Sequence, residues 1–97
     1  MFEWDEEKRD ATLDKHGLDF LDVAEIFATD HLILPARSEI EHRQMVVGQV
    51  NDVAIAVAFT LREDTIRIIT ARRARKNERE ALEAHVARRD AKNEKSD

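Results

Sequence analysis

Six basic side chains gather between residues 65 and 79 around a single carboxylate, that of Glu78. Guanidinium groups stay charged at every relevant pH and bind phosphate through two parallel hydrogen bonds. They also stabilise the extra negative charge that a phosphate gains in the transition state of its cleavage. The pattern therefore indicates a phosphate-bearing ligand. The six basic residues are Arg67, Arg72, Arg73, Arg75, Lys76 and Arg79.

A solvated surface of ion pairs is the plain alternative for this cluster. Arg75 and Glu78, and likewise Arg79 and Glu83, have the spacing of pairs on one helix face. Exposed pairs of this kind are common and contribute little to stability. The sequence alone leaves both interpretations open.

A second candidate for chemistry is the tripeptide Lys15-His16-Gly17. Histidine is the side chain best suited to proton transfer near neutral pH. At the end of a helix it is also a common capping charge, which is the alternative here. The other histidines (His31, His42 and His85) have no metal-ligand spacing, and cysteine is absent, so the sequence predicts no metal site and no cofactor.

The 97 residues suffice for one domain with a modest core. The net charge of −5 is uneven, because residues 1–50 carry most of the acidic excess and residues 51–97 are slightly basic. Screening confines electric fields to about 10 Å, so a local basic patch can still attract a phosphate. The start of the chain does not resemble a signal peptide, and the longest apolar run (53–61) is too short to span a membrane. We expect a soluble, cytoplasmic protein.

The first third of the chain predicts a short strand at 2–4 and two helices. Asp5 is a suitable N-cap for a helix that ends at Gly17. A second helix begins at Asp19, and its apolar stripe is Phe20, Val23, Ala24 and Phe27.

Four strands follow, at 31–34, 42–50, 53–62 and 65–71, and then a polar helix from about 74 to 92. The odd positions of 53–62 are large and apolar, whereas the even positions carry alanines followed by Thr60 and Arg62. One face of this strand is therefore core, and the other lets a ligand approach closely. By alternation Arg67 and Arg72 point to opposite faces, unless a bulge near Thr70-Ala71 reunites them.

The expected fold class is α+β: a small antiparallel sheet with two N-terminal helices and one C-terminal helix. Residues 1–92 form the single domain, and residues 93–97 form a disordered tail.

Three segments together resemble the BrnT family of toxins, the toxic halves of bacterial type II toxin–antitoxin pairs. The resemblance covers about residues 2–83. It rests on W-D-x-x-K at residues 4–8, K-H-G-x-x-F at 15–20 and R-I-I-[ST]-A-R at 67–72, which are specific in combination.

This resemblance implies a RelE-like fold and a metal-independent endoribonuclease that inhibits translation by cleaving RNA. It implies a ribbon-helix-helix, BrnA-like antitoxin as partner in a hetero-oligomer, and contact with operator DNA only through that antitoxin. Within this frame the RNA's 2′-hydroxyl attacks the adjacent phosphate, with His16 or Glu78 as base or acid. The catalytic residues would be His16, Arg62, Arg67, Arg72, Glu78 and Arg79. The RNA-binding residues would be Lys15, Arg43, Thr60, Arg73, Arg75 and Lys76.

The chain departs from the family pattern at three places. Thr12 stands where the family usually has Asn, and Phe59 and Leu82 stand where it often has Tyr. A catalytically degenerate toxin that only binds its antitoxin is therefore the main alternative. A DNA-binding regulator acting alone conflicts with the net charge and with the lack of a helix-turn-helix signature, and a metal hydrolase conflicts with the scattered histidines.

Overall fold

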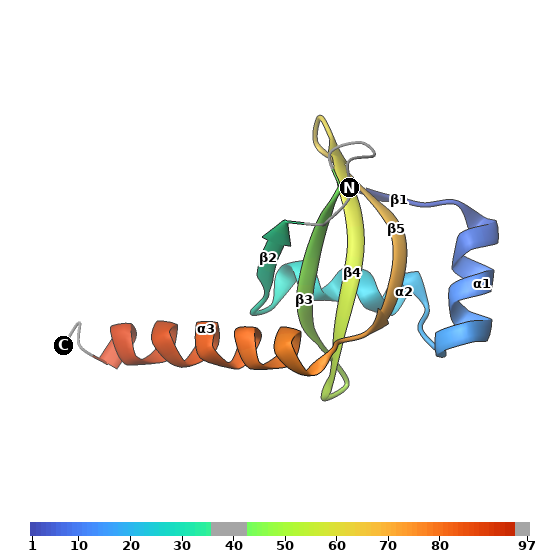
Figure 1. Ribbon diagram of the computed structural model, residues 1–97. Coiled ribbons are helices and arrows are strands. Elements are labelled where there is room, and N and C mark those ends of the chain that lie inside the picture. The colour runs from blue at the N-terminus through green and yellow to red at the C-terminus, as the bar shows by residue number, and fades with distance from the viewer. Residues whose placement is uncertain (36–42, 95–97) are drawn as a thin grey trace.

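The computed structural model describes residues 1–35 and 43–94. Its elements follow the predicted order, with one 3₁₀ helix added (Figure 1). No helix among these residues is both long and apolar enough to cross a membrane. The elements are β1 (Phe2–Glu3), α1 (Glu6–His16), α2 (Phe20–Val23), η1 (Ala24–Ala28), β2 (Leu32–Pro35), β3 (Gln44–Val50), β4 (Val53–Arg62), β5 (Thr65–Arg73) and α3 (Lys76–Glu94).

The strands form one five-stranded sheet in the order β1-β5-β4-β3-β2. The predicted α+β class is confirmed, but the sheet is mixed rather than antiparallel. The chain enters through β1, which pairs in parallel with β5 over two residues, Phe2 with Ile66 and Glu3 with Arg67. The other three pairings are antiparallel. A parallel edge strand this short gives no alternation pattern of its own, so the sequence could not reveal its direction.

The first predicted helix is confirmed, and the second is only partly correct. The Asp5 side chain accepts a hydrogen bond from the Glu7 backbone N–H at the start of α1, and Gly17 ends the helix with φ of 68°. The second helix has one α-helical segment of four residues and continues as the 3₁₀ helix η1. A 3₁₀ helix has three residues per turn, so buried side chains recur every three residues. The fully buried side chains are accordingly Phe20, Val23 and Ile26, whereas Phe27 is half-buried.

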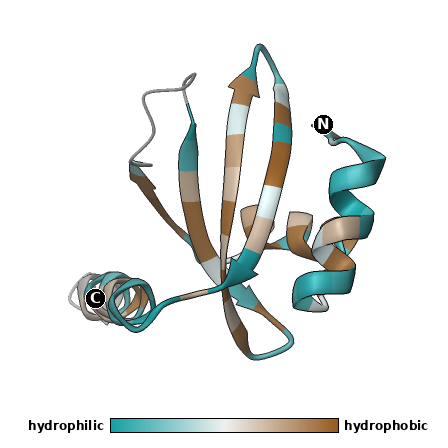
Figure 2. Cartoon of the chain, turned by 45° about the vertical axis from the view of Figure 1, so that its right-hand side comes forward, coloured by the Kyte–Doolittle hydropathy of each residue, from teal (hydrophilic) through white to brown (hydrophobic). Residues whose placement is uncertain are grey.

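One face of the sheet carries the main core. Ile55, Val57 and Phe59 of β4 are buried there, as their alternation predicted, together with Ile68 and Ala71 of β5. The buried residues of α2 and η1 pack against them. Figure 2 shows hydrophobic residues concentrated on the strands and on these short helices.

A β-bulge in β5 decides which arginines share a face. Ala58 pairs with Thr70 and Phe59 pairs with Ile68, so one residue of β5, Ile69, has no opposite number. The alternation of β5 therefore reverses at this point. Arg67 (opposite Thr60) and Arg72 (opposite Ala56) thus lie on the same face of the sheet, opposite the main core. The bulge lies just before Thr70-Ala71, where the sequence allowed for a bulge without predicting it.

Helix α3 covers only part of this second face. Leu82 packs with Val47 and Ala56 in a smaller apolar cluster, and Val86 packs against it. The rest of the helix extends beyond the sheet (Figure 1). It runs to Glu94, so residues 93 and 94 of the expected tail are helical. Residues 95–97 of that tail, and residue 42 of the predicted strand at 42–50, lie outside the described residues.

Candidate functional site

A pocket of about 420 Å³ opens where the end of α1, the end of β5 and the start of α3 meet. Three chain segments supply its basic lining, and His16 contributes the only titratable ring among its lining residues. We call it the histidine pocket. Its lining residues are Lys15, His16, Arg72, Arg73 and Arg75.

The position of His16 follows from how α1 ends and where it packs. The left-handed conformation of Gly17 ends the helix directly after His16. β1 pairs with only two residues of β5, and no other strand of residues 1–35 and 43–94 pairs with that edge. Helix α1 packs against β5 instead (Figure 1). The last turn of α1 thereby reaches the end of β5.

Two hydrogen bonds beside the histidine pocket join Arg72 to Glu78. Arg72 donates from Nη1 to Oε1 at 2.7 Å and from Nη2 to Oε2 at 2.9 Å. Their side chains are 29% and 11% exposed. The hydrogen bonds from Arg72, more than any other contact, hold the pKa of the Glu78 carboxyl below its usual value.

Glu78 also holds the start of α3. Its Oε1 accepts a hydrogen bond from the Arg75 backbone N–H at 2.7 Å. Arg75 precedes the first helical residue, so this is the carboxylate half of a capping box. The sequence contains this signal, a Glu three residues after the cap position, but the spacing of Arg75 and Glu78 equally fits the side-chain pair considered above.

A second group of predicted site residues lies at the other end of the same sheet face. Thr60 and Arg67 are cross-strand partners, and Arg67 pairs with Glu3 at 3.4 Å. Arg62 lies at the β4–β5 turn, and Arg43 directly precedes β3. Arg43 Nε is buried and has no hydrogen-bond partner among the residues that the structure describes. We call Arg43, Thr60, Arg62 and Arg67 the distal cluster.

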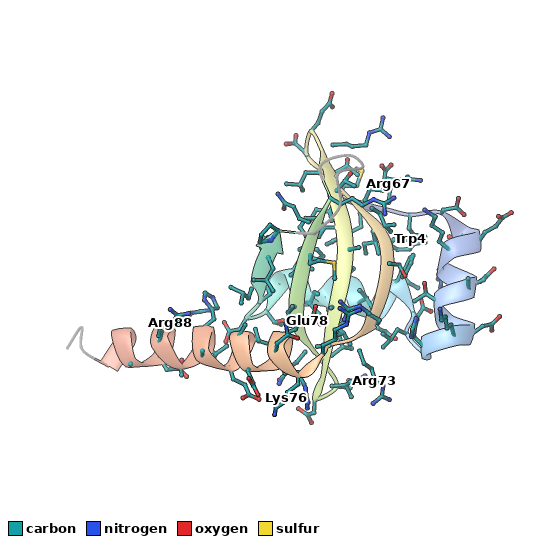
Figure 3. The ribbon with its side chains drawn as sticks, in the orientation of Figure 1. Trp4, Arg67, Arg73, Lys76, Glu78 and Arg88 are labelled. Atoms are coloured by element: carbon teal, nitrogen blue, oxygen red, sulfur yellow. The ribbon has the colours of Figure 1, made fainter. Side chains whose placement is uncertain are left out.

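The distal cluster and the histidine pocket are separated along β5. Figure 3 shows Arg67 near one end of this strand, and Arg73 and Glu78 near the other. The cross-strand partners of Arg67 and Arg72 on β4, Thr60 and Ala56, are four residues apart, which is about 13 Å at the rise of a strand. The sequence predicts one phosphate clamp that contains both arginines. In the structure, the two arginines lie at separate places on one face of the sheet.

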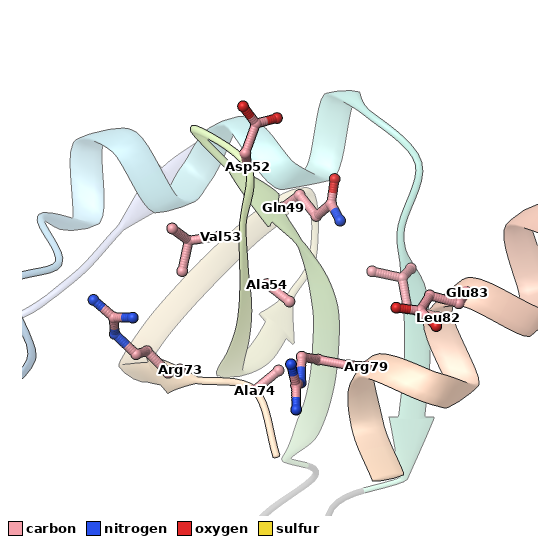
Figure 4. Close-up of a pocket in the computed structure, with 9 residues that line it drawn as sticks. All are labelled: Gln49, Asp52, Val53, Ala54, Arg73, Ala74, Arg79, Leu82 and Glu83. Carbon is pink, nitrogen blue, oxygen red and sulfur yellow. The ribbon is translucent and has the colours of Figure 1, made fainter. Parts of the chain in front are cut away.

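The two remaining predicted residues lie outside both groups. Arg79 lines a neighbouring hollow of about 500 Å³, which it shares with Arg73 (Figure 4). Lys76 is exposed and makes a loose ion pair with Glu80, at 3.9 Å. The pairing of Glu3 with Arg67 has no signal in the sequence, because only the parallel pairing of β1 with β5 brings the two together.

The two positions at which the family often has Tyr are both buried. Phe59 is 1% exposed within the main core, on the sheet face opposite Thr60. Leu82 of α3 is 4% exposed and packs against Val47 and Ala56 of the sheet. Neither side chain lines the histidine pocket.

Comparison with known proteins gives one clear match. The family model of the BrnT ribonuclease toxins of type II toxin–antitoxin systems matches residues 4–78. A search of curated proteins finds no match. The matched segment includes α1, strands β2 to β5 and Glu78, and thus both ends of the sheet face that carries the basic residues. The chain belongs to the BrnT family of ribonuclease toxins of type II toxin–antitoxin systems.

Proposed function

We propose that this protein is the toxin of a type II toxin–antitoxin pair and cleaves RNA in the histidine pocket without a metal ion. One observation carries the proposal. A histidine and three arginines from three segments line one pocket, in a chain of a ribonuclease toxin family. RNA contains its own nucleophile, the 2′-hydroxyl, so the protein needs to supply only proton transfer and charge stabilisation.

His16 is the proton-transfer group in this proposal. The 2′-oxygen loses its proton and bonds to the adjacent phosphorus, and the bond from phosphorus to the 5′-oxygen breaks as that oxygen gains a proton. The products are a 2′,3′-cyclic phosphate and a free 5′-hydroxyl. Such proton transfer contributes typically 10²- to 10⁴-fold to rate.

Arg72 is the principal stabiliser of the charge that develops on the phosphate. Its guanidinium is held by Glu78 from one side and lines the pocket. Preorganised donors of this kind are each worth about 10²- to 10³-fold. Arg73, Arg75 and Lys15 add exposed positive charge around the same pocket.

Glu78 is a positioning residue rather than the catalytic base. Both of its oxygens already accept hydrogen bonds, and its lowered pKa makes it a weaker proton acceptor. This assignment narrows the choice between His16 and Glu78 that the sequence left open.

The distal cluster binds the RNA backbone away from the cleaved bond. Between it and the histidine pocket, β4 presents the small side chain of Ala58 on the same face, whereas Ala56 is buried under Leu82. A single strand can therefore lie close to the sheet with one phosphate at Arg72 and another near Arg67. Arg79 and Lys76, which lie outside both groups, are less central to this proposal than the sequence implied.

The partner in this proposal is a ribbon-helix-helix, BrnA-like antitoxin that forms a hetero-oligomer with the toxin and carries it to operator DNA. Cleavage of RNA inhibits translation, and these partners place the activity in the cytoplasm. Thus the RNA is substrate, and operator DNA is reached only through the antitoxin.

A degenerate toxin that only binds its antitoxin is the alternative, based on the two missing tyrosines. The burial of Phe59 on the opposite face weakens that ground, because a hydroxyl there points toward the core and not toward the histidine pocket. Leu82 likewise lies outside the pocket. The active toxin is thus the better-supported function.

The test is cleavage of total RNA by purified protein in EDTA, for the wild type, His16→Ala and Arg72→Ala. We expect cleavage by the wild type and a loss of about 100-fold or more in each variant. Arg88→Ala is the control, since Arg88 is exposed on α3 away from the pocket and should leave the rate unchanged (Figure 3). An inactive wild type would favour the degenerate alternative, and activity that EDTA abolishes would contradict metal independence.

A further inference from the structure

A groove runs between α3 and the β3–β4 turn and has no part in the proposed cleavage. It consists of the hollow of about 500 Å³ in Figure 4 and an adjoining one of about 790 Å³. The two share the lining residues Gln49, Asp52, Leu82 and Glu83, so they form one continuous depression. We call it the acidic groove.

The two ends of the acidic groove carry opposite charge. The larger hollow is lined by four carboxylates, those of Asp30, Asp52, Glu83 and Asp90. Of these four carboxylates, only that of Asp30 has an ion-pair partner, Arg89, among the side chains that the structure describes. Arg73 and Arg79 line the far end, in the smaller hollow.

The floor of the larger hollow is apolar. Leu82, Val86 and Ala87 of α3 line it, and Leu82 is already seated on the sheet. A floor of this kind between carboxylate walls suits a segment that presents an apolar side chain flanked by lysine or arginine. RNA is unsuited, because the carboxylates of Asp52, Glu83 and Asp90 repel its phosphates.

We propose that the acidic groove is the docking site for a basic, partly apolar segment of the antitoxin. This rests on the proposed function, which supplies the antitoxin as partner. The opposite charges at the two ends fix the direction of the segment: its lysine or arginine side chains face Asp90 and Glu83, and a carboxylate of the segment faces Arg73 and Arg79. Complementary charge of this kind speeds association and fixes register.

The acidic end of the docking site lies apart from His16, so substrate and antitoxin share only the region around Arg73. Arg73 is the one residue that lines both the acidic groove and the histidine pocket. Charge changes at the acidic end of the groove should therefore separate the binding of the antitoxin from the cleavage of RNA.

The experiment compares the wild type with the double variant Glu83→Lys/Asp90→Lys. Both residues are exposed on α3, so the substitutions leave the core untouched. The control is Asp10→Lys/Glu25→Lys, which makes the same charge change at exposed sites on α1 and η1. The probe is the protein encoded by the reading frame beside the gene of this chain, and its Kd is measured by calorimetry at low and moderate salt.

We expect Glu83→Lys/Asp90→Lys to weaken this Kd at least tenfold and to reduce its salt dependence, with RNA cleavage and the melting temperature unchanged. An unchanged Kd, equal weakening by the control, or no binding to the wild type would each overturn the docking site. If the double variant changed the oligomeric mass of this chain in the absence of the partner, the docking site would also be overturned. The acidic groove would then be occupied by a second copy of this chain. If the wild type did not cleave RNA, the proposed function would be wrong. The comparison of Kd values would still show whether the acidic groove binds the partner.

Discussion

Arg72 and Glu78 form one fixed unit that ties the end of β5 to the start of α3. Two hydrogen bonds of 2.7 and 2.9 Å join their side chains, and the carboxylate also holds the Arg75 backbone N–H. The direction in which the Arg72 guanidinium faces the histidine pocket is therefore set by the position of α3. Stability and activity should both depend on this pair.

Glu78→Gln should destabilise the fold in a pH-dependent way. The folded pKa of Glu78 lies below its ordinary value of 4.5. The stabilisation is therefore fully present above that ordinary value and is lost as the pH falls through the folded pKa. We expect a deficit of about 1.5 to 3 kcal/mol in free energy of unfolding at pH 7, shrinking toward pH 3. Denaturant titrations of both proteins at several pH values measure it.

Glu80→Gln is the matched control for this prediction. Glu80 is exposed and makes only the 3.9 Å pair with Lys76, so its loss should cost well under about 1 kcal/mol at any pH. A Glu78→Gln deficit that is the same at pH 7 and pH 3 would contradict the ionic origin of the stabilisation.

Arg72→Lys should lower the cleavage activity, although the substitution keeps the positive charge. A lysine ammonium is a point charge and cannot form the two parallel hydrogen bonds that hold Arg72 on Glu78. We expect kcat to fall about 100-fold, with KM changed much less. Arg75→Lys is the comparison, because the Arg75 contact with Glu78 uses the backbone N–H and survives the exchange. Equal activity of Arg72→Lys and the wild type would show that orientation is unimportant.

The sequence predicted the element order because its signals were local. Asp5 and Gly17 bounded α1 correctly, and the alternation of residues 53–62 identified the core face of β4. The parallel pairing of β1 with β5 could not be predicted from the sequence, because a strand of two residues shows no periodicity. The same limit applied to Glu3, whose contact with Arg67 depends on that pairing.

The five residues that line the histidine pocket are all among those singled out from the sequence, but their arrangement could not be predicted. His16 and Arg72 do share a pocket, but only the bulge at Ile69 decides that Arg67 joins Arg72 on one face. A bulge adds one residue without a distinctive sequence signature here, since Ile68 and Ile69 are both buried β-branched residues. The separation of the basic residues into a pocket, a distal cluster and Arg79 thus required the tertiary structure.

Gly48→Ala should destabilise the protein through a backbone-level clash. A Cβ at Gly48 would lie 2.9 Å from the Cβ of Ile26 and 3.3 Å from its Cγ2. A Cβ cannot rotate away, so β3 and η1 must move apart, at a cost of about 1 to 3 kcal/mol. Gly17→Asn is the control, because a Cβ there meets nothing within 4 Å and Asn tolerates the left-handed conformation. Thermal unfolding of both variants checks the prediction, and an unchanged melting temperature for Gly48→Ala would contradict the close packing.

Arg67→Ala should weaken RNA binding without slowing the chemical step. Arg67 shares the face of Arg72, but it lies in the distal cluster and is partly neutralised by Glu3. We expect KM for a long RNA to rise several-fold with kcat unchanged, and the slope of log KM against log salt to fall by about one unit at most. A dinucleotide substrate is too short to reach the distal cluster from the histidine pocket, so its cleavage should be unaffected. If Arg67→Ala lowered kcat for the dinucleotide instead, the guanidinium would have to act at the cleaved phosphate, and the division into two groups would be wrong.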